Sequence, residues 1–427
     1  MLKEDIRETR LDNGLVILTD RMEGVRSATL GFFYRVGSRH EPAHLNGITH
    51  FIEHAVFKGS ARRSAMQIAV EQDRLGGNLD AYTTHEETGF AIKVIDDQLP
   101  AAFDLLADML AAPRFAENDL ESEQRVIIEE IKMTDDSPEE YLGELFHSGY
   151  FPGHPLGLSI AGTPDSVRTF GHAATRDYHA SAFAPHNLVI AAAGNVDHEQ
   201  IRDLATVAGL DKATNSGSEL ITVSATPVPA APIQITQKAD LEQAHVIIAT
   251  PFVTARDERR YAADLLANII GGGTSSRLWQ KVREERGLAY SVGSSAVLFH
   301  DCGIFSVSAG TSPEQVDEVL DIVLDELRWI VRNGVTNEEL QLMKDQTRAS
   351  ILLGLEDSAG RAATLAHMEM VHGKQIALEE TLAKVEAVTI ENIAKLAGEF
   401  FRTEKIAFAA IGDLGNLHVT RDRLGIG

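Results

Sequence analysis

The chain has 427 residues but only one cysteine, Cys302, so it cannot form an intrachain disulfide. It also lacks any apolar run near the ~18 residues that a membrane-spanning helix needs. Residues 1–8 are rich in charge and contain no apolar segment, so we expect no secretory signal. Together these absences favour a cytoplasmic protein that does not bind a membrane.

Basic residues are in the minority, and they form no cluster. The 39 Lys and Arg residues stand against 63 Asp and Glu, which gives a formal net charge of −24. Binding to a phosphate backbone needs clustered cations, so we expect no nucleic-acid partner. The acidic excess has two interpretations: it keeps the protein in solution, or part of it lines a cavity that receives basic peptides.

The sequence does contain a long-range repeat. The largely apolar segment 188–196 ends in Gly-Asn-Val, and a similar segment at 406–414, 218 positions later, ends in Gly-Asp-Leu. Segment 88–94 precedes an amphipathic helical pattern, and segment 302–308 precedes another. Two repeats at nearly the same offset indicate duplicated domains.

The repeat and the length predict the domain organisation. A chain of this size suits two domains of about 200 residues. Residues from 211 to 232 are rich in Ala, Thr, Ser and Pro, without helical periodicity. We therefore expect an N-terminal metal-binding domain over 1–211, a linker over 212–232 and a homologous C-terminal domain over 233–427. Short β-branched strands mixed with helices favour an α+β fold, with helices on one face of a largely antiparallel sheet.

The strongest chemical signal is His50-Phe51-Ile52-Glu53-His54, in an apolar segment that we expect to be helical. Residues four apart on a helix project from one face, so the two imidazoles can share one Zn²⁺ at ~2.0–2.1 Å each. Glu53 lies on the same side but displaced, so it can act on a water molecule without being a ligand. Such a motif arises by chance in about one such chain in twenty, so a buried helix with two hydrogen-bonded histidines stays open.

A catalytic zinc needs a third protein ligand, and the helical stretch 119–133 offers one. Glu123 and Glu130 lie two turns apart on one stripe, with Ile127 between them. Glu130 is the candidate ligand, and Glu123 is a candidate for orienting a ligand histidine. Glu129 points about 100° away and is the weaker candidate. An ordinary surface helix is the alternative.

These residues together resemble the pitrilysin/insulinase family of inverzincin zinc metallopeptidases. The likeness is greatest to bacterial homologues of the mitochondrial processing peptidase beta subunit. The motif continues into Phe57-Lys58-Gly59 as in that family, and Glu130 follows His54 by 76 residues, where the third ligand of the family falls. Matching segments run in the family's order along nearly the whole chain: 11–15, 50–59, 76–86, 123–130, 275–290 and 412.

The resemblance implies roles for further residues. It implies one Zn²⁺ per chain and makes Glu53 the general base. It gives Tyr290 the stabilisation of the oxyanion and Arg283 the binding of substrate carbonyls. The substrate strand would lie at Asp80 and Ala81, although many relatives have Asn where this chain has Asp80. Segment 261–270, at the place of the metal helix in the second half, has no such motif and should bind no metal.

The resemblance also implies the fold and the function. The fold is the one shared by LuxS and the mitochondrial processing peptidase. The function is that of a zinc metalloendopeptidase that cleaves peptides or unfolded segments inside a dimeric chamber. The partner is a second copy or a related chain, whose zinc Arg283 and Tyr290 would reach. A non-catalytic assembly or scaffold subunit of the same fold, or a peptide-binding subunit, is the alternative, and the complete residue set argues against the scaffold.

Overall fold

The computed structural model describes residues 4–77, 79–214, 221 and 225–426. Contacts divide the chain into two compact units. Unit 1 comprises 1–133, 158–224 and 352–376, and unit 2 comprises 134–157, 225–351 and 377–427. The units thus differ from the continuous ranges 1–211 and 233–427, because each includes one segment from the other half of the sequence. Part of the expected linker, at 215–220 and 222–224, lies outside the described residues.

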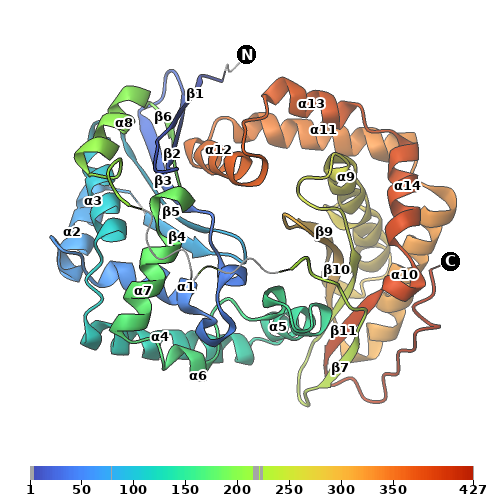
Figure 1. Ribbon diagram of the computed structural model, residues 1–427. Helices are drawn as coiled ribbons and strands as arrows, with labels where there is room; N and C mark the ends of the chain where they lie inside the picture. Colours follow the sequence, from blue (N-terminus) through green and yellow to red (C-terminus); the bar gives the residue numbers. More distant parts are fainter. Residues whose placement is uncertain (1–3, 78, 215–220, 222–224, 427) are drawn as a thin grey trace. The chain divides into compact units, whose positions relative to one another are not determined.

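Unit 1 is built on a six-stranded sheet with the order β1-β2-β6-β3-β5-β4 (Figure 1). Only β2 and β6 are parallel, and every other neighbouring pair is antiparallel. The strands are β1 (Ile6–Arg10), β2 (Val16–Arg21), β3 (Ser27–Tyr34), β4 (Leu79–Thr83), β5 (Thr88–Ile95) and β6 (Leu188–Gly194). The helices are α1 (Ile48–Ala55), α2 (Ala65–Leu75), α3 (Leu99–Ala111), α4 (Glu117–Asp136), α6 (Pro164–Val167), α7 (His172–Ala182), α8 (His198–Val207) and α12 (Ser358–His372).

Unit 2 repeats this arrangement with a five-stranded sheet, in the order β7-β11-β8-β10-β9. Its single parallel pair is β7 with β11. The strands are β7 (Ile233–Gln237), β8 (Ala244–Pro251), β9 (Ala289–Leu298), β10 (Gly303–Thr311) and β11 (Ala407–Gly412). The helices are α5 (Pro138–Tyr150), α9 (Arg260–Gly271), α10 (Val316–Asn333), α11 (Asn337–Gly354), α13 (Leu378–Glu386) and α14 (Ile390–Phe400), with a π-helix, η8 (Trp279–Glu284).

The predicted repeat corresponds to matching elements of the two units. Segment 188–196 contains β6 and segment 406–414 contains β11, and each strand is fully buried and has a neighbouring strand on both sides. Strand β5 followed by α3 corresponds to β10 followed by α10, and α1 after β3 corresponds to α9 after β8. The prediction of an α+β fold with two related halves is confirmed.

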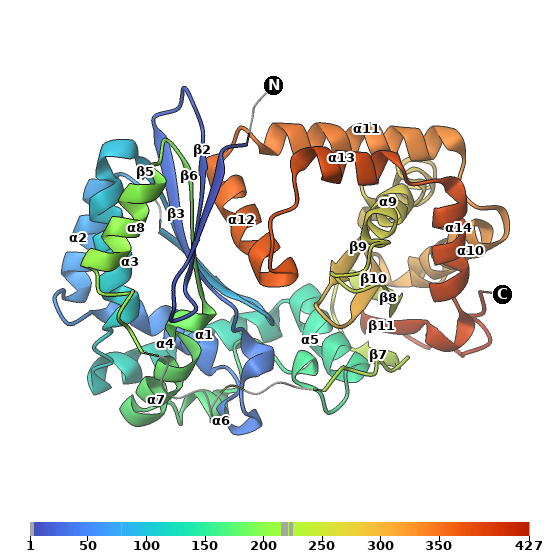
Figure 2. The ribbon, with the colours of Figure 1, turned by 45° about the horizontal axis from the view of Figure 1, so that its top comes forward.

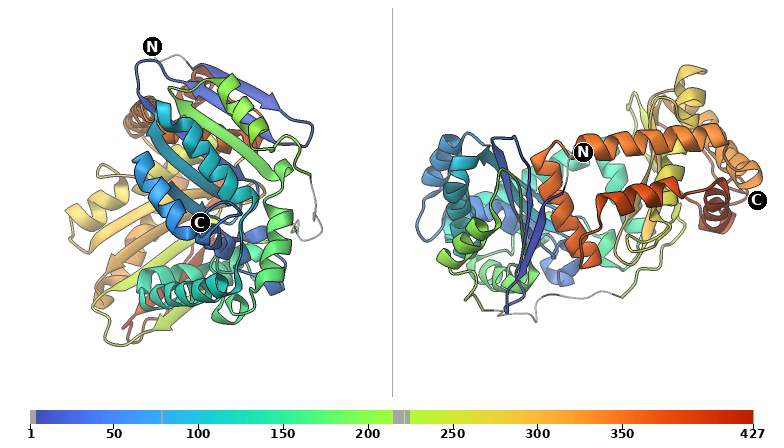
Figure 3. Two further views of the ribbon diagram at one scale, coloured as in Figure 1. Left: turned by 90° about the vertical axis from the view of Figure 1, so that its left-hand side faces the viewer. Right: turned by 90° about the horizontal axis from the view of Figure 1, so that it is seen from above.

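Each sheet has helices on both faces, whereas the sequence predicted helices on one face. In unit 1, α3 is one of the helices that pack on one face of the sheet (Figure 3, left). The ring of Phe103 in α3 lies 5.3 Å from that of Phe32 in β3. The opposite face is covered by α12, whose Leu365 joins the cluster of Phe33 and Val189 (Figure 2). In unit 2, α5 packs on β8 and β11 in the same way.

Buried ion pairs hold α12 in place. The carboxylate of Glu369 is 2% exposed, and its two oxygens accept from Arg10 at 2.7 Å and from Arg35 at 2.9 Å. Arg361 pairs with the buried Asp20 of β2. The pair of Arg361 and Asp20 is costly to break, because either partner alone would stay buried without a counter-charge. Within the described ranges no helix is long and apolar enough to cross a membrane.

Candidate metal centre

Helix α1 carries the histidine motif, and its beginning is tightly specified. Gly47 precedes the helix with a φ of 95°, and a Cβ there would lie 2.6 Å from the carbonyl oxygen of Ala161. This position therefore needs glycine. The N–H groups of Gly47 and Thr49 donate to the buried carboxylate of Glu41 at 2.7 and 2.8 Å. The carboxylate thus satisfies two of the N–H groups that every helix leaves free at its beginning.

The apolar face of α1 sets the direction of the two histidines. Phe51 and Ile52 are fully buried, and the Phe51 ring packs against Phe170 with centroids 5.3 Å apart. His50 and His54 lie on another face and are half-buried, and their rings are 4.6 Å apart. The predicted placement of both imidazoles on one side of a helix is therefore present in the structure.

Glu130 of α4 completes a set of three donors. One ligand atom each from His50, His54 and Glu130 lie within 4.8 Å of one another. Nε2 of His54 is 3.7 Å from a carboxylate oxygen of Glu130. Tetrahedral zinc at 2.0–2.1 Å separates its ligand atoms by about 3.4 Å, so small side-chain movements would close this set. Glu129 instead pairs with Lys132 at 2.6 Å in an exposed position.

Glu123 orients His54, as its place on the helix predicts. Its carboxylate is 3% exposed, and one oxygen lies 2.9 Å from Nδ1 of His54. A hydrogen on Nδ1 leaves the lone pair of Nε2 for a metal, on the side of Glu130. The other oxygen binds Lys58 Nζ at 2.5 Å. Burial by itself raises the pKa of Glu123, but the bonds with His54 and Lys58 outweigh it and hold that pKa below its usual value.

Burial keeps His50 in the neutral form that a metal needs. It lowers the pKa of His50 to about 4, and the charge of the neighbouring His54 acts in the same direction. Nδ1 of His50 is buried and has no hydrogen-bond partner among the described residues. A buried polar atom of this kind costs free energy unless it gains a partner.

Glu53 lies beside the three donors but outside the set. Its buried carboxylate accepts a 2.6 Å hydrogen bond from the hydroxyl of Thr83 in β4. Burial raises the pKa of Glu53, and the nearby Glu130 carboxylate raises it further, against the effects of Thr83 and His54. A carboxylate with a raised pKa and no role as a ligand suits a general base.

The candidate substrate strand is at the end of the sheet. Strand β4 pairs with β5, where Asp80 is opposite Ala91 and Ala81 is opposite Phe90. It is last in the order of described strands, so no other described strand pairs with its outer edge. The following turn is fixed by the buried Arg39, which binds Glu86 at 2.6 Å. Asn78, beside this strand in the family pattern, lies outside the described residues.

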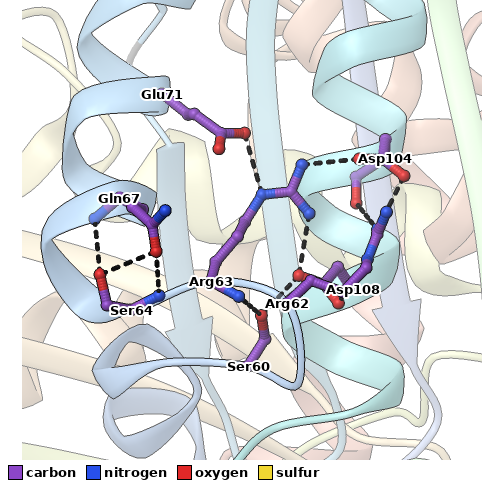
Figure 4. A network of polar contacts seen from close by, with 8 residues as sticks. All are labelled: Ser60, Arg62, Arg63, Ser64, Gln67, Glu71, Asp104 and Asp108. Carbon is purple, nitrogen blue, oxygen red and sulfur yellow. Dashed lines mark hydrogen bonds and ion pairs between the residues drawn. The ribbon is translucent and has the colours of Figure 1, made fainter.

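The segment after α1 is anchored to α3 by a charge network (Figure 4). Arg63 binds Asp104 at 2.6 Å and Asp108 at 2.8 Å, both on α3, and Glu71 of α2 at 2.9 Å. Arg62 adds bonds to the same two aspartates. This network fixes the chain just beyond Lys58 and so limits the movement of the end of α1.

The donor set fits zinc. Two imidazoles and one carboxylate, with a carboxylate base beside them, are the usual make-up of a catalytic zinc site. The carboxylate on the far side of His54 is the usual support for a ligand histidine. The residues are thus suited to hold one Zn²⁺ in unit 1.

Arg283 and Tyr290 lie in unit 2, where they contact each other. Arg283 Nη1 donates to the carbonyl of Tyr290 at 2.6 Å. The guanidinium lies over two rings, 4.2 Å from the centroid of Trp279 and 4.7 Å from that of Tyr290. The Tyr290 residue is 78% exposed. The pair is formed across the π-helix η8 and the beginning of β9, and π-helical turns recur at functional sites.

Comparison with known proteins gives the family. A model described as insulinase (peptidase family M16) matches residues 16–164, and one described as the peptidase M16 inactive domain matches 170–347. An uncharacterized zinc protease from Streptomyces coelicolor is 37% identical, over 97% of this chain and 91% of its own length. The chain belongs to peptidase family M16. Another M16 relative, the uncharacterized zinc protease YmxG of Bacillus subtilis, is 34% identical, over 96% of this chain and 99% of its own.

Solved structures share the fold. A protease from Helicobacter pylori aligns with a TM-score of 0.88 at 21% identity, over 96% of this chain and 100% of that one. A chain of complex III2 from Candida albicans aligns with a TM-score of 0.83 at 21% identity, over 98% and 99%. The predicted family and fold class are confirmed. The "inactive domain" description of 170–347 agrees with the lack of a metal motif at 261–270.

Sequence reasoning assigned no role to three residues that support the candidate metal centre. Lys58 binds Glu123, Thr83 binds Glu53, and Glu41 caps the metal helix. Lys58 and Thr83 stand in the segments that matched the family, but their partners are distant in sequence. A pattern of spacing carries no signal for such contacts.

Proposed function

We propose that the chain is a zinc metalloendopeptidase that cleaves peptides or unfolded segments. The convergence of His50, His54 and Glu130 beside a buried Glu53 that is left out of the set carries this proposal. M16 relatives named zinc proteases support it.

The residues of unit 1 would divide the work of hydrolysis. His50, His54 and Glu130 would hold a Zn²⁺, which would supply a Lewis acid for the peptide carbonyl and for water. Glu53 takes a proton from the attacking water and delivers it to the leaving amine. Thr83 holds the Glu53 carboxylate in position through its hydrogen bond. The support of His54 by Glu123 and Lys58 keeps that imidazole in one tautomer.

The peptide would add to the outer edge of β4 at Asp80 and Ala81. Backbone hydrogen bonds to a strand edge bind peptides of many sequences, which suits an enzyme for unfolded segments. Tyr290 would stabilise the oxyanion and Arg283 would bind carbonyls of the substrate backbone. The exposure of Tyr290 and the two rings around Arg283 support roles in contact with a ligand.

We further propose that two chains, identical or related, enclose a chamber in which Arg283 and Tyr290 serve the zinc of the partner. Mixing Glu53→Gln chains with Tyr290→Phe chains tests this arrangement. Activity should return in the mixture and stay absent when Glu53→Gln chains are mixed with the double variant. If subunits exchange and the first mixture stays inactive, the shared active centre is wrong.

A non-catalytic assembly subunit is the second candidate. The alignment with a chain of complex III2 favours it, because that protein is part of a large assembly. Metal content and cleavage of an unstructured, internally quenched peptide separate the two. The peptidase should contain about one zinc per chain, lose cleavage to a chelator, and lose ~10²–10⁴-fold of its rate in Glu53→Gln, with the zinc retained. A zinc-free chain without cleavage is the result expected for the assembly subunit.

A further inference from the structure

A cavity of about 530 Å³ opens within unit 2, away from every residue assigned above. It is lined by α9, α11, α13 and the last residue of β9. Its volume is within the range of sites for small molecules. The lining combines charged and polar groups, such as Arg260 and Asp264, with apolar groups such as Leu298 and Met343.

The cavity lies between helices of unit 2 that correspond, in chain order, to the helices carrying the candidate metal donors in unit 1. Helix α9 follows β8 as α1 follows β3, and α11 follows α10 as α4 follows α3. The metal donors come from α1 and α4, and the cavity lies between α9 and α11. Figures 1 and 2 both show α11 and α13 beside each other near α9.

The correspondence extends to single residues. Asp264 and Asn268 of α9 both line the cavity and are four positions apart, which is the spacing of the two metal histidines. Ser350 follows the first residue of α11 by 13 positions, as Glu130 follows that of α4. Where α1 and α4 carry the candidate metal donors, α9 and α11 thus carry Asp264, Asn268 and Ser350, which can form hydrogen bonds.

The two charged groups of the lining are not paired with each other. Asp264 is exposed, and its side chain has no ion pair or hydrogen bond in the described part of the chain. A carboxylate so placed is stabilised by an incoming cation. Arg260 is held over the Tyr261 ring at 4.3 Å and donates to the Tyr261 hydroxyl and the Asp257 carbonyl. Its nearest carboxylate, on Glu258, is 3.9 Å away, and several of its five N–H donors remain for a ligand.

We propose that this cavity binds zwitterionic dipeptides, with the ammonium group at Asp264 and the carboxylate at Arg260. Four positions on a helix separate the two residues by about 6 Å along its axis. Two extended residues of a peptide span about 7 Å, so both ends of a dipeptide reach their partners. Leu298 and Met343 provide the apolar wall for its side chains. This site goes beyond the proposed hydrolysis, because neither Glu53 nor the metal donors take part in it.

Calorimetric titration of the full-length, zinc-loaded Glu53→Gln chain with Ala-Leu tests the proposal. We expect saturable binding below about 1 mM. Acetylation of the peptide amine, amidation of its carboxylate and the added substitution Asp264→Asn should each weaken binding at least tenfold. Ser350→Trp, which fills the cavity from the other helix, should abolish it. Asp413→Asn, an exposed aspartate outside the cavity, is the matched control and should bind normally.

Three results would overturn the proposal: no binding up to about 10 mM, equal binding to the Asp264→Asn chain, or equal binding of free leucine. The first result would show that the cavity does not bind dipeptides, and the last would show that it binds single amino acids. Hydrolysis is measured separately, with the quenched peptide and the single variant Asp264→Asn, whose rate should match wild type. Binding that depends on Asp264 in a chain without cleavage would refute the proposed function and leave this site standing.

Discussion

The bond between Lys58 and Glu123 makes a sharp prediction about zinc affinity. Replacing Lys58 by Met keeps an unbranched side chain but removes the cation that lies 2.5 Å from a nearly fully buried carboxylate. Glu123 is then held by His54 alone. We expect it to turn toward other donors or to take up a proton, and in either case to orient His54 less well.

The size of the effect follows from the two roles of the pair. Loss of a carboxylate that supports a ligand histidine lowers metal affinity by about 10–100-fold. Lys58 acts one step further out, so we expect about tenfold weaker zinc binding. The Lys58 side chain is 37% exposed, so solvent offsets part of the lost ion pair. The metal-free chain should lose about 1 kcal/mol of stability.

Competition with a chromophoric chelator measures the zinc affinity, and urea unfolding of the metal-free chain measures the stability. Lys58→Arg keeps the charge and should stay close to wild type. Lys132→Met is the matched control, because Lys132 pairs with Glu129 on an exposed face of α4. Unchanged zinc affinity in Lys58→Met, with a normal fold, would refute the argument that this ion pair orients His54.

Three further predictions concern stability. Gly47→Ala should lower the free energy of unfolding by about 2 kcal/mol or more, because the new Cβ would lie 2.6 Å from a carbonyl oxygen. Gly76→Ala, with no atom within 4 Å of the new Cβ, should lower it by about 1 kcal/mol. Thermal unfolding of the two variants compares these losses. Burial lowers the pKa of His179 to about 4 from its unfolded value of 6.5, so the folded state binds fewer protons than the unfolded state. As the pH falls from 6.5 to 4, His179 should therefore lower the free energy of unfolding of the wild type by about 2 kcal/mol. Urea titrations across this range should show that His179→Gln lacks this contribution. Glu369→Ala should lower the free energy of unfolding by about 2–3 kcal/mol, because Arg10 and Arg35 lose their carboxylate partner but both remain partly exposed to solvent. Limited proteolysis should then cut α12 first, and cleavage no faster than in wild type would contradict this.

The common face of the two candidate histidine ligands was predictable from the sequence because its geometry is local. His50 and His54 lie on one helix, and helical spacing alone fixes their common face. Glu123 and Glu130 depend on a second helix, predicted over 119–133 and present over Glu117–Asp136. Helical spacing predicted that both glutamates lie on one face of that helix. The resemblance to the family predicted that this face lies next to the histidines.

The contacts around the centre were not predictable, because tertiary packing sets them. The hydroxyl of Thr83 reaches Glu53 only because β4 lies beside α1. The sequence also did not predict that α5, from the first half of the chain, packs in unit 2, or that α12, from the second half, packs in unit 1. An amphipathic pattern shows that a helix is half-buried and does not show which sheet it covers. A signal was present, since the continuous apolar run at Leu188–Gly194 requires cover on both faces of the sheet.

The place of α12 in unit 1 sets a delay during synthesis. The last strand of the first sheet ends at Gly194, and α12 begins at Ser358, 164 residues later. A ribosome adding about 5–20 residues per second needs roughly 10–30 s for that distance. During this time the face carrying Val16, Leu18 and Phe33 has no helix to cover it. The nascent chain therefore presents a complete apolar sheet surface, which makes this interval the one in which a chaperone has most to protect.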